Sequence, residues 1–288
     1  MIQKVLLSSP LEDKTKFFKK TVLSWYKSNK REFSWRNTKD PWKILLIEVI
    51  AQQTQLERAN QYYKKFIKAF PTPKHMASSK YIEVQKLWSG LGYNNRARRL
   101  FEASKIINEK GFNNLYPDFE ILPGVGEYTK NALLSFAYGE KVLTKDTNIN
   151  RIFARFFGTD LENYSINELQ KILLKNISSR DLNQALMDLG STICSSRHPQ
   201  CSICPLEETC NKYIVKSKTL KVGKFKGSNR EIRGQIVRYL IQNNNVDKKI
   251  LKKDLKIDNN NLEIALRGLE RDGLLRFSNN NVVSINSE

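Results

Sequence analysis

Residues 194–210 read CSSRHPQCSICPLEETC and contain every cysteine of the chain. Their spacing is C-x6-C-x2-C-x5-C, so four thiols fall within one short segment. Four thiolates this close in sequence can bind one inorganic centre, either a [4Fe–4S] cluster or a zinc ion. Zinc sites usually use two C-x2-C pairs, and this run has one; disulfides are uncommon in cytosolic proteins. The run therefore predicts a [4Fe–4S] cluster bound by Cys194, Cys201, Cys204 and Cys210.

The rest of the chain is strongly basic. Lys and Arg number 49 against 29 Asp and Glu, which gives a net charge of +20 over 288 residues. A field of this sign attracts polyanions such as DNA or RNA. No apolar stretch approaches the ~18 residues of a membrane span, and the N-terminus becomes charged before a signal-peptide core forms. We expect a cytoplasmic, nucleoid-associated prokaryotic protein that is monomeric and has no membrane partner.

Helical patterns dominate from about residue 12 to residue 214, so the predicted fold class is mainly α. Asp40 and Pro41 are typical of an N-cap and a first helical position, and the apolar run WKILLIEVIA follows. No alternating strand pattern of useful length precedes residue 215. Further helices are expected at 56–70, 79–88, 95–110, 127–138, 148–157, 165–176 and 181–194.

The pattern changes after residue 214. Residues 215–227, VKSKTLKVGKFKG, hold five lysines and no acid, which is typical of a basic linker. Residues 228–288 then show three helical segments and a terminal hairpin, the order of a small winged-helix-like α+β domain. The third helix of such a domain commonly enters a DNA groove; a docking or dimerising domain is the alternative. The three helices are expected at 229–242, 248–255 and 259–272.

Residues 122–129, LPGVGEYT, form a second motif. Gly124 and Gly126 let the backbone approach a phosphate, and the following helix directs its N-terminal amides toward that anion. Such a contact fixes a protein on a nucleic-acid backbone without reading bases. Taken alone, the motif is also compatible with an ordinary turn between helices.

Together, LPGVG-x-YT, the run DTNIN that begins at Asp146 and the four-cysteine segment resemble the helix-hairpin-helix DNA glycosylases of the endonuclease III superfamily. The segments EVIAQQTQ (48–55), LWSGLGY (87–93) and LNQALMDLG (182–190) are similar to its adenine-specific MutY branch. The resemblance extends over residues 15–214. It implies a glycosylase core at 1–214, with a six-helix domain at 41–140 and an iron–sulfur domain formed by 1–40 with 141–214.

Base removal from DNA needs an acid that protonates the leaving base and a carboxylate that stabilises the sugar cation. Glu48 is the only acid in its apolar segment, where burial would favour the protonated acid. The resemblance implies that Glu48 protonates adenine at N7. Asp146 is placed to cap the helix that begins near Asn148. The resemblance implies that Asp146 stabilises the cation and that Asn148 helps to place the water and the carboxylate.

Tyr128 occupies the position where strand-cutting relatives carry a lysine. A phenol cannot form their Schiff base, so the resemblance implies base excision without efficient lyase activity. Gln53 would insert into the base stack, and Leu91 and Tyr93 would contact the opposite strand. The remaining predicted base-pocket and DNA contacts are Trp35, Arg36, Gln52, Thr54, Gly124, Gly126 and Thr129.

Three functions stay open at this point. The leading hypothesis is a glycosylase acting on double-stranded DNA that removes adenine paired with 8-oxoguanine or guanine. A thymine/uracil mismatch glycosylase of the same superfamily is the main alternative, because some of its members also carry tyrosine at the hairpin. A non-catalytic iron–sulfur DNA-binding regulator is the third, which Glu48, Asp146 and Asn148 disfavour.

Two features leave details of DNA recognition open. Residues 228–288 are too few for the β-rich domain with which MutY relatives recognise 8-oxoguanine, so the opposite-base preference is undetermined. Arg96, Arg98 and Arg99 are typical either of phosphate contacts or of a solvated helix face.

Overall fold

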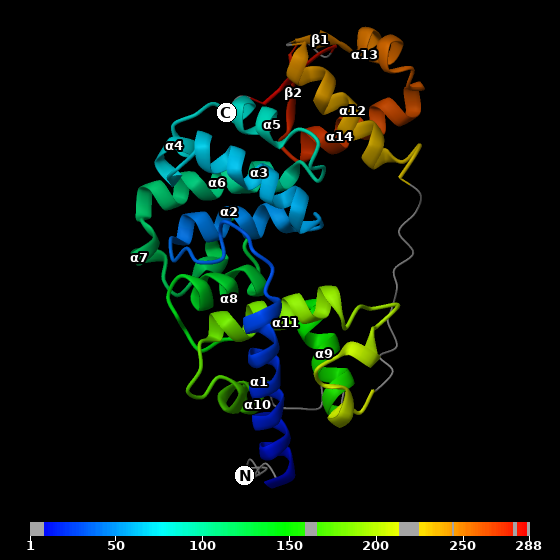
Figure 1. The fold of residues 1–288 in the computed structure, drawn as a ribbon. Coiled ribbons are helices and arrows are strands. Elements are labelled where there is room, and N and C mark those ends of the chain that lie inside the picture. Colours follow the sequence, from blue (N-terminus) through cyan, green and yellow to red (C-terminus); the bar gives the residue numbers. More distant parts are fainter. Residues whose placement is uncertain (1–8, 159–165, 213–224, 244, 279–280, 287–288) are drawn as a thin grey trace, which may run out of the picture. The chain divides into compact units, whose positions relative to one another are not determined.

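The computed structural model describes residues 9–158, 166–212, 225–243, 245–278 and 281–286. Within these ranges the chain is mainly helical, with one small antiparallel sheet near its C-terminus, which confirms the predicted fold class (Figure 1). The chain forms two compact units, Met1–Ile44 with Gly126–Lys218, and Leu45–Val125 with Thr219–Glu288. None of the helices in the described ranges combines the length and hydrophobicity needed to cross a membrane.

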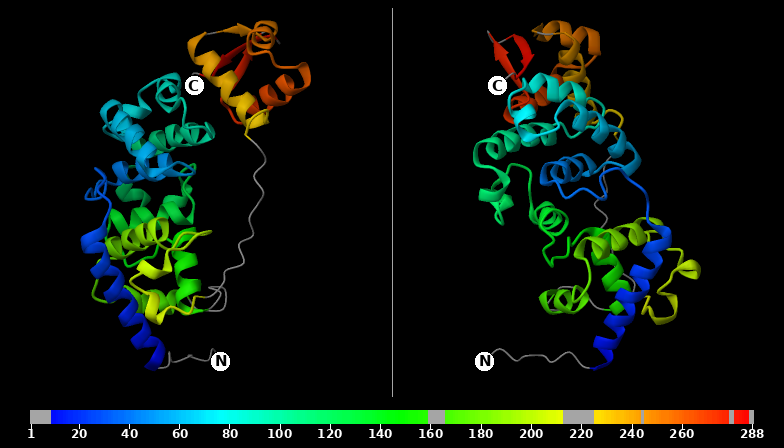
Figure 2. Two further views of the ribbon diagram at one scale, coloured as in Figure 1. Left: turned by 45° about the vertical axis from the view of Figure 1, so that its right-hand side comes forward. Right: turned by 60° about the vertical axis from the view of Figure 1, so that its left-hand side comes forward.

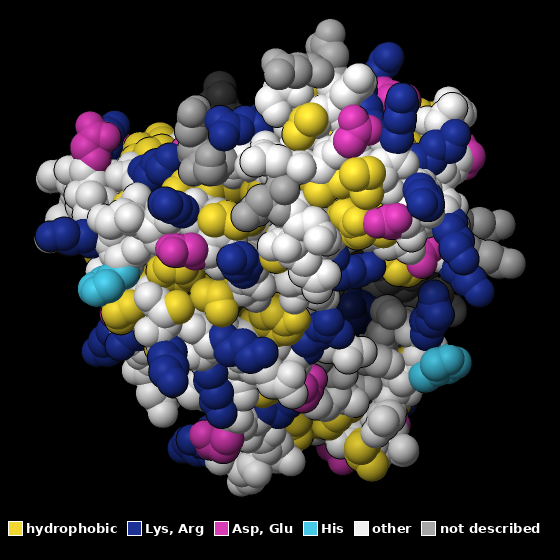
Figure 3. Space-filling view, turned by 90° about the horizontal axis from the view of Figure 1, so that it is seen from above, with side chains coloured by type: hydrophobic (Ala, Val, Ile, Leu, Met, Phe, Trp, Pro, Cys, Tyr) yellow, Lys and Arg dark blue, Asp and Glu magenta, His cyan; other side chains and the backbone are white. Residues whose placement is uncertain are grey.

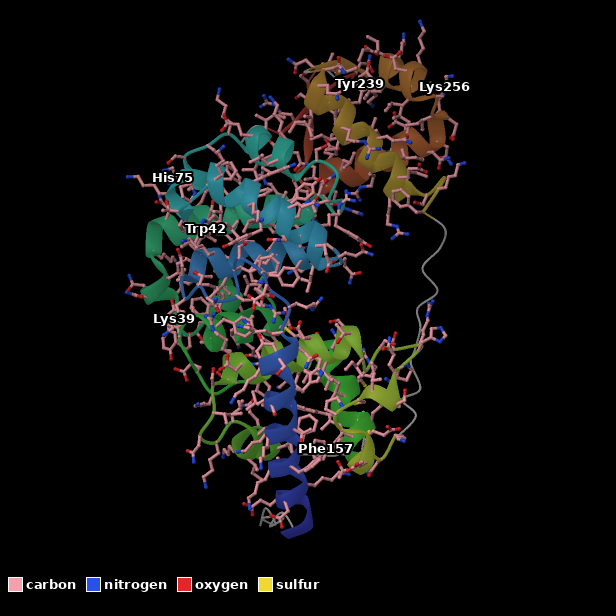
Figure 4. All side chains as sticks on the ribbon, in the orientation of Figure 1. Lys39, Trp42, His75, Phe157, Tyr239 and Lys256 are labelled. Carbon is pink, nitrogen blue, oxygen red and sulfur yellow. The ribbon has the colours of Figure 1, made fainter. Side chains whose placement is uncertain are left out.

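The first unit is built around α1 (Ser9–Asn29), which packs against α11 (Ser179–Thr192) and α10 (Ile166–Leu173) (Figure 1). Phe18 of α1 meets three rings of α9 (Thr147–Phe157), with centroid distances of 5.6, 4.7 and 5.5 Å. The last of these rings, Phe157, is labelled in Figure 4. This aromatic contact fixes α9 in the core of the unit. The unit also contains α8 (Glu127–Phe136) and the short 3-10 helices η3 (Cys201–Ile203) and η4 (Glu207–Thr209).

The unit boundaries differ from the expected domain limits at residues 40 and 140. The first boundary falls inside α2 (Pro41–Ala51), and α8 groups with the cysteine segment rather than with the preceding helices. The reason is local packing, because Ser135 of α8 donates to Ser179 at 3.1 Å and accepts from Asn183 at 3.0 Å. The predicted start of α2 is confirmed, since Asp40 Oδ1 accepts the Trp42 N–H at 2.9 Å.

Residues 45–125 of the second unit have an aromatic core. The Phe66 and Trp88 rings lie 5.7 Å apart, and the Tyr81 and Phe101 rings lie 5.5 Å apart. These contacts join α3 (Leu56–Ala69) and α6 (Asn95–Lys110) to α5 (Tyr81–Trp88). The helices of this part are α3 (Leu56–Ala69), α4 (Pro73–Ala77), α5 (Tyr81–Trp88), α6 (Asn95–Lys110), α7 (Phe112–Leu115) and the 3-10 helix η1 (Phe119–Ile121).

Residues 225–286 form a small α+β fold, seen from two further sides in Figure 2. Its sheet has the order β1–β3–β2, with Leu275 opposite Ile285 and Phe277 opposite Val283. Helix, strand, two helices and a hairpin in this order give winged-helix topology. Part of the expected linker at 215–227, up to residue 224, lies outside the described residues. The elements are α12 (Asn229–Gln242), β1 (Val246–Asp247), α13 (Lys248–Leu255), α14 (Asn259–Arg271), β2 (Leu275–Ser278) and β3 (Val282–Ile285).

Candidate functional site

Asp146 is the N-cap of α9, as the sequence predicted. Its Oδ1 accepts the Ile149 N–H at 2.7 Å, and its Oδ2 accepts from Asn148 Nδ2 at 2.9 Å. The carboxylate is half-buried and sits at a helix N-terminus, where the helix dipole favours negative charge. Lys145, just before it, has a left-handed backbone with φ of 42°. One backbone amide and one side-chain amide therefore hold this carboxylate.

Asn148 is held in turn by Arg151. Arg151 Nη2 donates to Asn148 Oδ1 at 2.7 Å and to the Gly190 carbonyl at 2.8 Å. A Cβ at Gly190 would lie 2.6 Å from Asn148 Cβ, so only glycine lets α11 approach α9 this closely. Asp146, Asn148 and Arg151 thus form one hydrogen-bonded chain along the first turn of α9.

The cysteine segment is attached to the same helix. Arg155 Nη1 donates to the Ser195 carbonyl at 2.7 Å and contacts Cys194 Sγ at 3.3 Å, while Arg151 Nε donates to the Cys194 carbonyl at 2.8 Å. The chain beyond Cys210 returns to the end of α9, where Asn211 Nδ2 donates to the Phe157 carbonyl at 3.0 Å. One helix therefore carries Asp146 at its start and anchors the cysteine segment along its length.

All four cysteines line one cavity of about 300 Å³, together with Arg155 and Lys212. Across the described ranges, no three His, Cys, Asp or Glu side chains are grouped closely enough to hold a single metal ion. A zinc ion binds thiolates at about 2.3 Å, which would bring the four sulfurs close together. A larger cluster lies between its thiolates and needs them further apart. Four thiols around one cavity are the donor set that a [4Fe–4S] cluster needs.

Two thiols of this cavity differ from ordinary surface cysteines. Burial, and to a smaller extent the neighbouring thiols, raise the pKa of Cys204 and Cys210. Both groups would be protonated thiols near neutral pH, and binding a metal centre would release their protons. Cys201 is the exposed member of the set.

Glu48 lies in the other unit, within α2, and is half-buried between the buried residues Ile47 and Val49. Tyr128, Asp146 and Asn148 belong to the first unit. Gln52 and Thr54 follow α2 and are half-buried, whereas Gln53 is exposed. The predicted acid is therefore placed by a buried helix, and the predicted DNA-inserting glutamine by the turn that ends it.

Arg96 of α6 is the residue that sequence reasoning misjudged, because it is neither a phosphate contact nor solvated. It is 8% exposed, and its Nη1 donates to the carbonyls of Val49 and Ile50, each at 3.1 Å, and to the Gln52 carbonyl. Its Nη2 donates to the Gly92 carbonyl at 3.2 Å and to the Leu91 carbonyl at 3.4 Å. Arg96 thereby joins the turn after α2 to the loop before α6.

These two loops carry two predicted DNA contacts, the inserting Gln53 and the opposite-strand residue Tyr93, in strained conformations. Gln53 and Tyr93 have positive φ values of 54° and 47°, in the left-handed region that non-glycine residues seldom adopt. Tyr93 is 51% exposed, whereas Leu91 is 8% exposed and packs inward. The structure thus presents Gln53 and Tyr93 at the surface, and the predicted role of Leu91 on the opposite strand has less geometric support.

The hairpin is followed by an uncapped helix start. Gly126 is the exposed N-cap of α8 and has no side chain that could accept a hydrogen bond. The N–H groups of the first turn of α8 are therefore not capped by this residue. Tyr128 is half-buried and Thr129 is buried. At Gly124, with φ of 85°, a Cβ would lie 3.1 Å from Arg99 Cβ. Glu127 is paired with Lys145 at 2.9 Å, which lowers the pKa of Glu127.

Arg36, a predicted base-pocket residue, lies inside the first unit. Its guanidinium donates to both carboxylate oxygens of Asp188, at 2.8 and 2.6 Å, and to the Tyr26 hydroxyl at 2.8 Å. Trp35 beside it is half-buried, with its ring stacked on Phe33 at 4.5 Å. This geometry gives Arg36 a scaffolding contact, and its place in a base pocket stays a prediction, as does that of Trp35.

The surface of the molecule agrees with the basic composition. On the face seen in Figure 3, Lys and Arg side chains are spread widely and outnumber Asp and Glu. This distribution suits a polyanionic ligand that crosses several elements.

Residues 46–178 match the family model described as "HhH-GPD superfamily base excision DNA repair protein". Over 212 residues the chain is 38% identical to an adenine DNA glycosylase of Buchnera aphidicola subsp. Baizongia pistaciae, with 69% of this chain and 59% of that protein covered. An adenine DNA glycosylase of Mycobacterium tuberculosis is 32% identical over 231 residues, with 75% of this chain and 76% of that protein covered.

Solved structures give a second comparison. The structure of a thermostable thymine-DNA glycosylase matches with a TM-score of 0.64 and 30% identity, covering 70% of this chain and 98% of that one. The matching part of the chain thus accounts for nearly the whole of that enzyme, but it spans about three fifths of the Buchnera relative, 59%.

Proposed function

The chain belongs to the HhH-GPD superfamily of base excision DNA repair proteins, and from that premise we propose that it is a DNA glycosylase that removes adenine mispaired with 8-oxoguanine or guanine in duplex DNA. The observation that carries this proposal is the fixed carboxylate of Asp146, which is held by a backbone amide and Asn148. A regulator has no need of a carboxylate positioned in this way. The names of the adenine DNA glycosylase relatives support adenine as the base.

In the proposed reaction the bond between the sugar C1′ and adenine N9 breaks. Glu48 donates a proton to N7 of the flipped adenine, so the base leaves as a neutral molecule. Asp146 stabilises the positive charge that develops on the sugar, and Asn148 holds that carboxylate and the attacking water in place. Water adds at C1′, and the products are free adenine and an abasic site.

Arg96 would position the residues that open the duplex. It ties the carbonyls of Gln52 and Gly92 to one guanidinium, and these residues adjoin Gln53 and Tyr93. Two side chains that insert together must keep a fixed separation, because a loop held loosely loses much of the benefit of insertion. We therefore propose Arg96 as a positioning residue.

The iron–sulfur cluster would be held by Cys194, Cys201, Cys204 and Cys210. It would fix the segment that Arg151 and Arg155 attach to α9. The cluster would therefore support the position of Asp146 at the start of that helix. Purified protein should be brown and contain about four irons per chain; stoichiometric zinc without iron or sulfide would contradict this assignment.

The deciding experiment is excision from four duplexes, carrying A·8-oxoguanine, A·G, T·G and U·G, with alkali added after the reaction. We expect adenine release from the first two, and strand breaks only after alkali. Glu48→Gln should abolish excision while leaving duplex binding intact, because an amide cannot donate the proton. Excision by Glu48→Gln at the wild-type rate would remove Glu48 from the mechanism.

The second candidate is a thymine/uracil mismatch glycosylase, which the likeness to the thymine-DNA glycosylase structure favours. Release of base from T·G and U·G alone would establish it. Borohydride should trap little covalent complex with any of these duplexes, because Tyr128 supplies no amine. Efficient trapping would show that a lysine acts, and Lys130 would be tested first.

A further inference from the structure

The winged-helix fold at residues 225–286 contains a helix-turn-helix pair whose outer face is not accounted for by the proposed glycosylase chemistry. α13 ends at Leu255, and α14 begins at Asn259 after a turn that contains Lys256, which Figure 4 labels. α14 buries one side on the fold through Leu262, Ala265, Leu266 and Leu269. The opposite side carries the exposed residues Asn259, Asn260, Ile264, Arg267 and Arg271.

The spacing of these exposed residues makes a single stripe. Asn260, Ile264, Arg267 and Arg271 follow one another at three- and four-residue intervals, which places them on one face of the helix. Ile264 is 49% exposed in the middle of this stripe. A single exposed isoleucine is common on a protein surface and does not by itself indicate a binding site. The stripe also carries the amide of Asn260 and the guanidinium groups of Arg267 and Arg271.

Most acids of this fold have a local hydrogen-bond or ion-pair partner. Its acids have local partners: Glu263 pairs with Lys248 at 3.3 Å, Asp272 pairs with Arg233, and Asp254 accepts from Tyr239. Asp247, Asp258 and Glu231 accept backbone N–H groups at helix starts, and among the acids of residues 225–286 only Glu270 has no such partner in the described structure.

The cations of the helix-turn-helix pair are treated differently. The structure gives no carboxylate partner, within the part of the chain that it describes, to six exposed side chains, which are Lys249, Lys252, Lys253, Lys256, Arg267 and Arg271. The exposed charges of the helix-turn-helix pair are therefore mostly positive, because these six cations stand against the exposed acids Asp254, Asp258 and Glu270.

We propose that this helix-turn-helix pair is a second duplex-binding site, with α14 in the major groove and the lysines of α13 on the phosphate backbone. An α-helix fits the major groove, and the amide of asparagine and the guanidinium of arginine match the edges of adenine and guanine there. Exposed Ile264 suits a thymine methyl group. In a helix-turn-helix, the N-terminal residues of the second helix contact bases, and here those residues are Asn259 and Asn260.

The inference is independent of the proposed glycosylase reaction, since it concerns binding to undamaged duplex. The competing occupant is a second copy of the chain, and the measurement distinguishes the two. Fluorescence anisotropy of full-length protein on an undamaged duplex, over a series of salt concentrations, gives affinity and the number of phosphate contacts. Sedimentation of the same samples without DNA gives the oligomeric state.

Two double variants separate the two helices. Lys252→Gln/Lys253→Gln should weaken binding to all sequences and reduce the log–log salt slope by about 0.9 per lost phosphate contact. Asn259→Ala/Asn260→Ala should leave that slope unchanged and remove the sequence preference seen in selection from random duplexes, with roughly a tenfold loss on the selected site. Lys171→Gln/Lys175→Gln, on α10 and in the turn that follows it, removes the same charge elsewhere and should change neither quantity.

The outcomes decide the proposal. If both α13 and α14 variants match the α10 control in affinity, slope and selected sequence, the helix pair does not bind DNA. If instead these variants dissociate a dimer of the free protein, the face is an interface between copies and the proposal is wrong. Thermal denaturation of each variant shows that its fold is intact. Single-turnover excision at saturating protein should stay at the wild-type rate, so a failure here is distinguishable from a failure of the glycosylase assignment.

Discussion

Arg36 and Arg96 are both buried arginines, each 8% exposed, yet their charges are compensated in opposite ways. Arg36 shares the fully buried carboxylate of Asp188 with Arg31, whereas Arg96 donates to backbone carbonyls and lies over the rings of Trp88 and Tyr93, at 4.9 and 5.7 Å. Burial alone would lower both pKa values. The Asp188 carboxylate reverses this and raises the pKa of Arg36, while Arg96 falls to a pKa of about 10.

The difference teaches what each region is built for. The ion pair between Asp188 of α11 and Arg36, in the segment before α2, holds these two elements together. Both charged groups are removed from water, so each depends on the other for compensation. Carbonyl groups at the end of α2 stabilise a cation through the helix dipole without cancelling it. Arg96 therefore keeps its charge without any carboxylate partner beneath the two loops that we expect to contact DNA, whereas Arg36 and Arg31 share the carboxylate of Asp188.

The largest expected loss of stability comes from breaking the ion pair of Asp188 with Arg31 and Arg36. Asp188→Asn leaves Arg31 and Arg36 without a carboxylate inside the first unit. Removing one partner of a buried ion pair typically costs about 3–5 kcal/mol, and we expect a loss of that size in the free energy of unfolding, measured with denaturant. Asp181→Asn, exposed on the same helix, is the control and should cost less than ~1 kcal/mol. Equal losses in the two variants would show that Asp188 contributes no special stability.

Arg96→Met should cost less stability and more activity. The substitution removes a buried charge instead of stranding one, so the loss comes from carbonyls left without donors, about 1–3 kcal/mol. Single-turnover excision should fall further than the unfolded fraction explains, because Gln53 and Tyr93 lose their common anchor. Fluorescence of 2-aminopurine at the target position reports the opening step. Lys105→Met on the same helix is the control. If Arg96→Met excises base as fast as this control, Arg96 is not a positioning residue.

Tyr26→Phe sharpens the comparison by making Arg36 slightly more like Arg96. The Tyr26 hydroxyl accepts from Arg36 at 2.8 Å and donates to Gln184 at 2.8 Å, and burial raises the pKa of Tyr26, which keeps it a donor at neutral pH. Loss of these bonds should cost about 1–2 kcal/mol in thermal or denaturant unfolding, with Asp188 still neutralising the cation. A cost as large as that of Asp188→Asn would mean that the hydroxyl, not the carboxylate, stabilises Arg36.

The helix cap at Asp146 and most of the helices could be predicted from the sequence, because they depend on residues close together in the chain. The cap at Asp146 requires a residue only three positions away, and the helices at 229–242 and 248–255 were predicted with the bounds that the structure has. Among the elements without a predicted range, α4, α7 and β1 are five, four and two residues long and too short to show a period.

The partners of the two buried arginines could not be predicted, for the opposite reason. Arg36 meets a carboxylate 152 positions away, and Arg96 meets carbonyls 44 to 47 positions away. Helical periodicity gives one usable signal, since Arg96 lies on the same face of α6 as the buried residues Leu100, Ala103 and Ile107. Because the partners of Arg96 are backbone groups, no residue type in the sequence marks them.

The smallest effect is expected at a third ion pair, Glu127 with Lys145, which is exposed where the other two sites are buried. Lys145 lowers the pKa of Glu127 below its ordinary 4.5, so the pair's contribution to stability is present above that value and lost as the pH falls below it. For an exposed pair the contribution is less than about 1 kcal/mol. Glu127→Gln should therefore lower stability slightly at neutral pH and match the wild type in acid.

Glu127→Gln also removes a carboxylate from the start of α8, where a phosphate would bind, so affinity for duplex DNA should rise by a few-fold at low salt. Stability curves from pH 7 downward and anisotropy at two salt concentrations test both statements, with Glu120→Gln as the charge-matched control. Weaker DNA binding by Glu127→Gln would mean that the main effect of the ion pair is to hold Lys145 and the turn at Asp146 in position. The pair would then have a structural role, as the pair of Arg36 and Asp188 has.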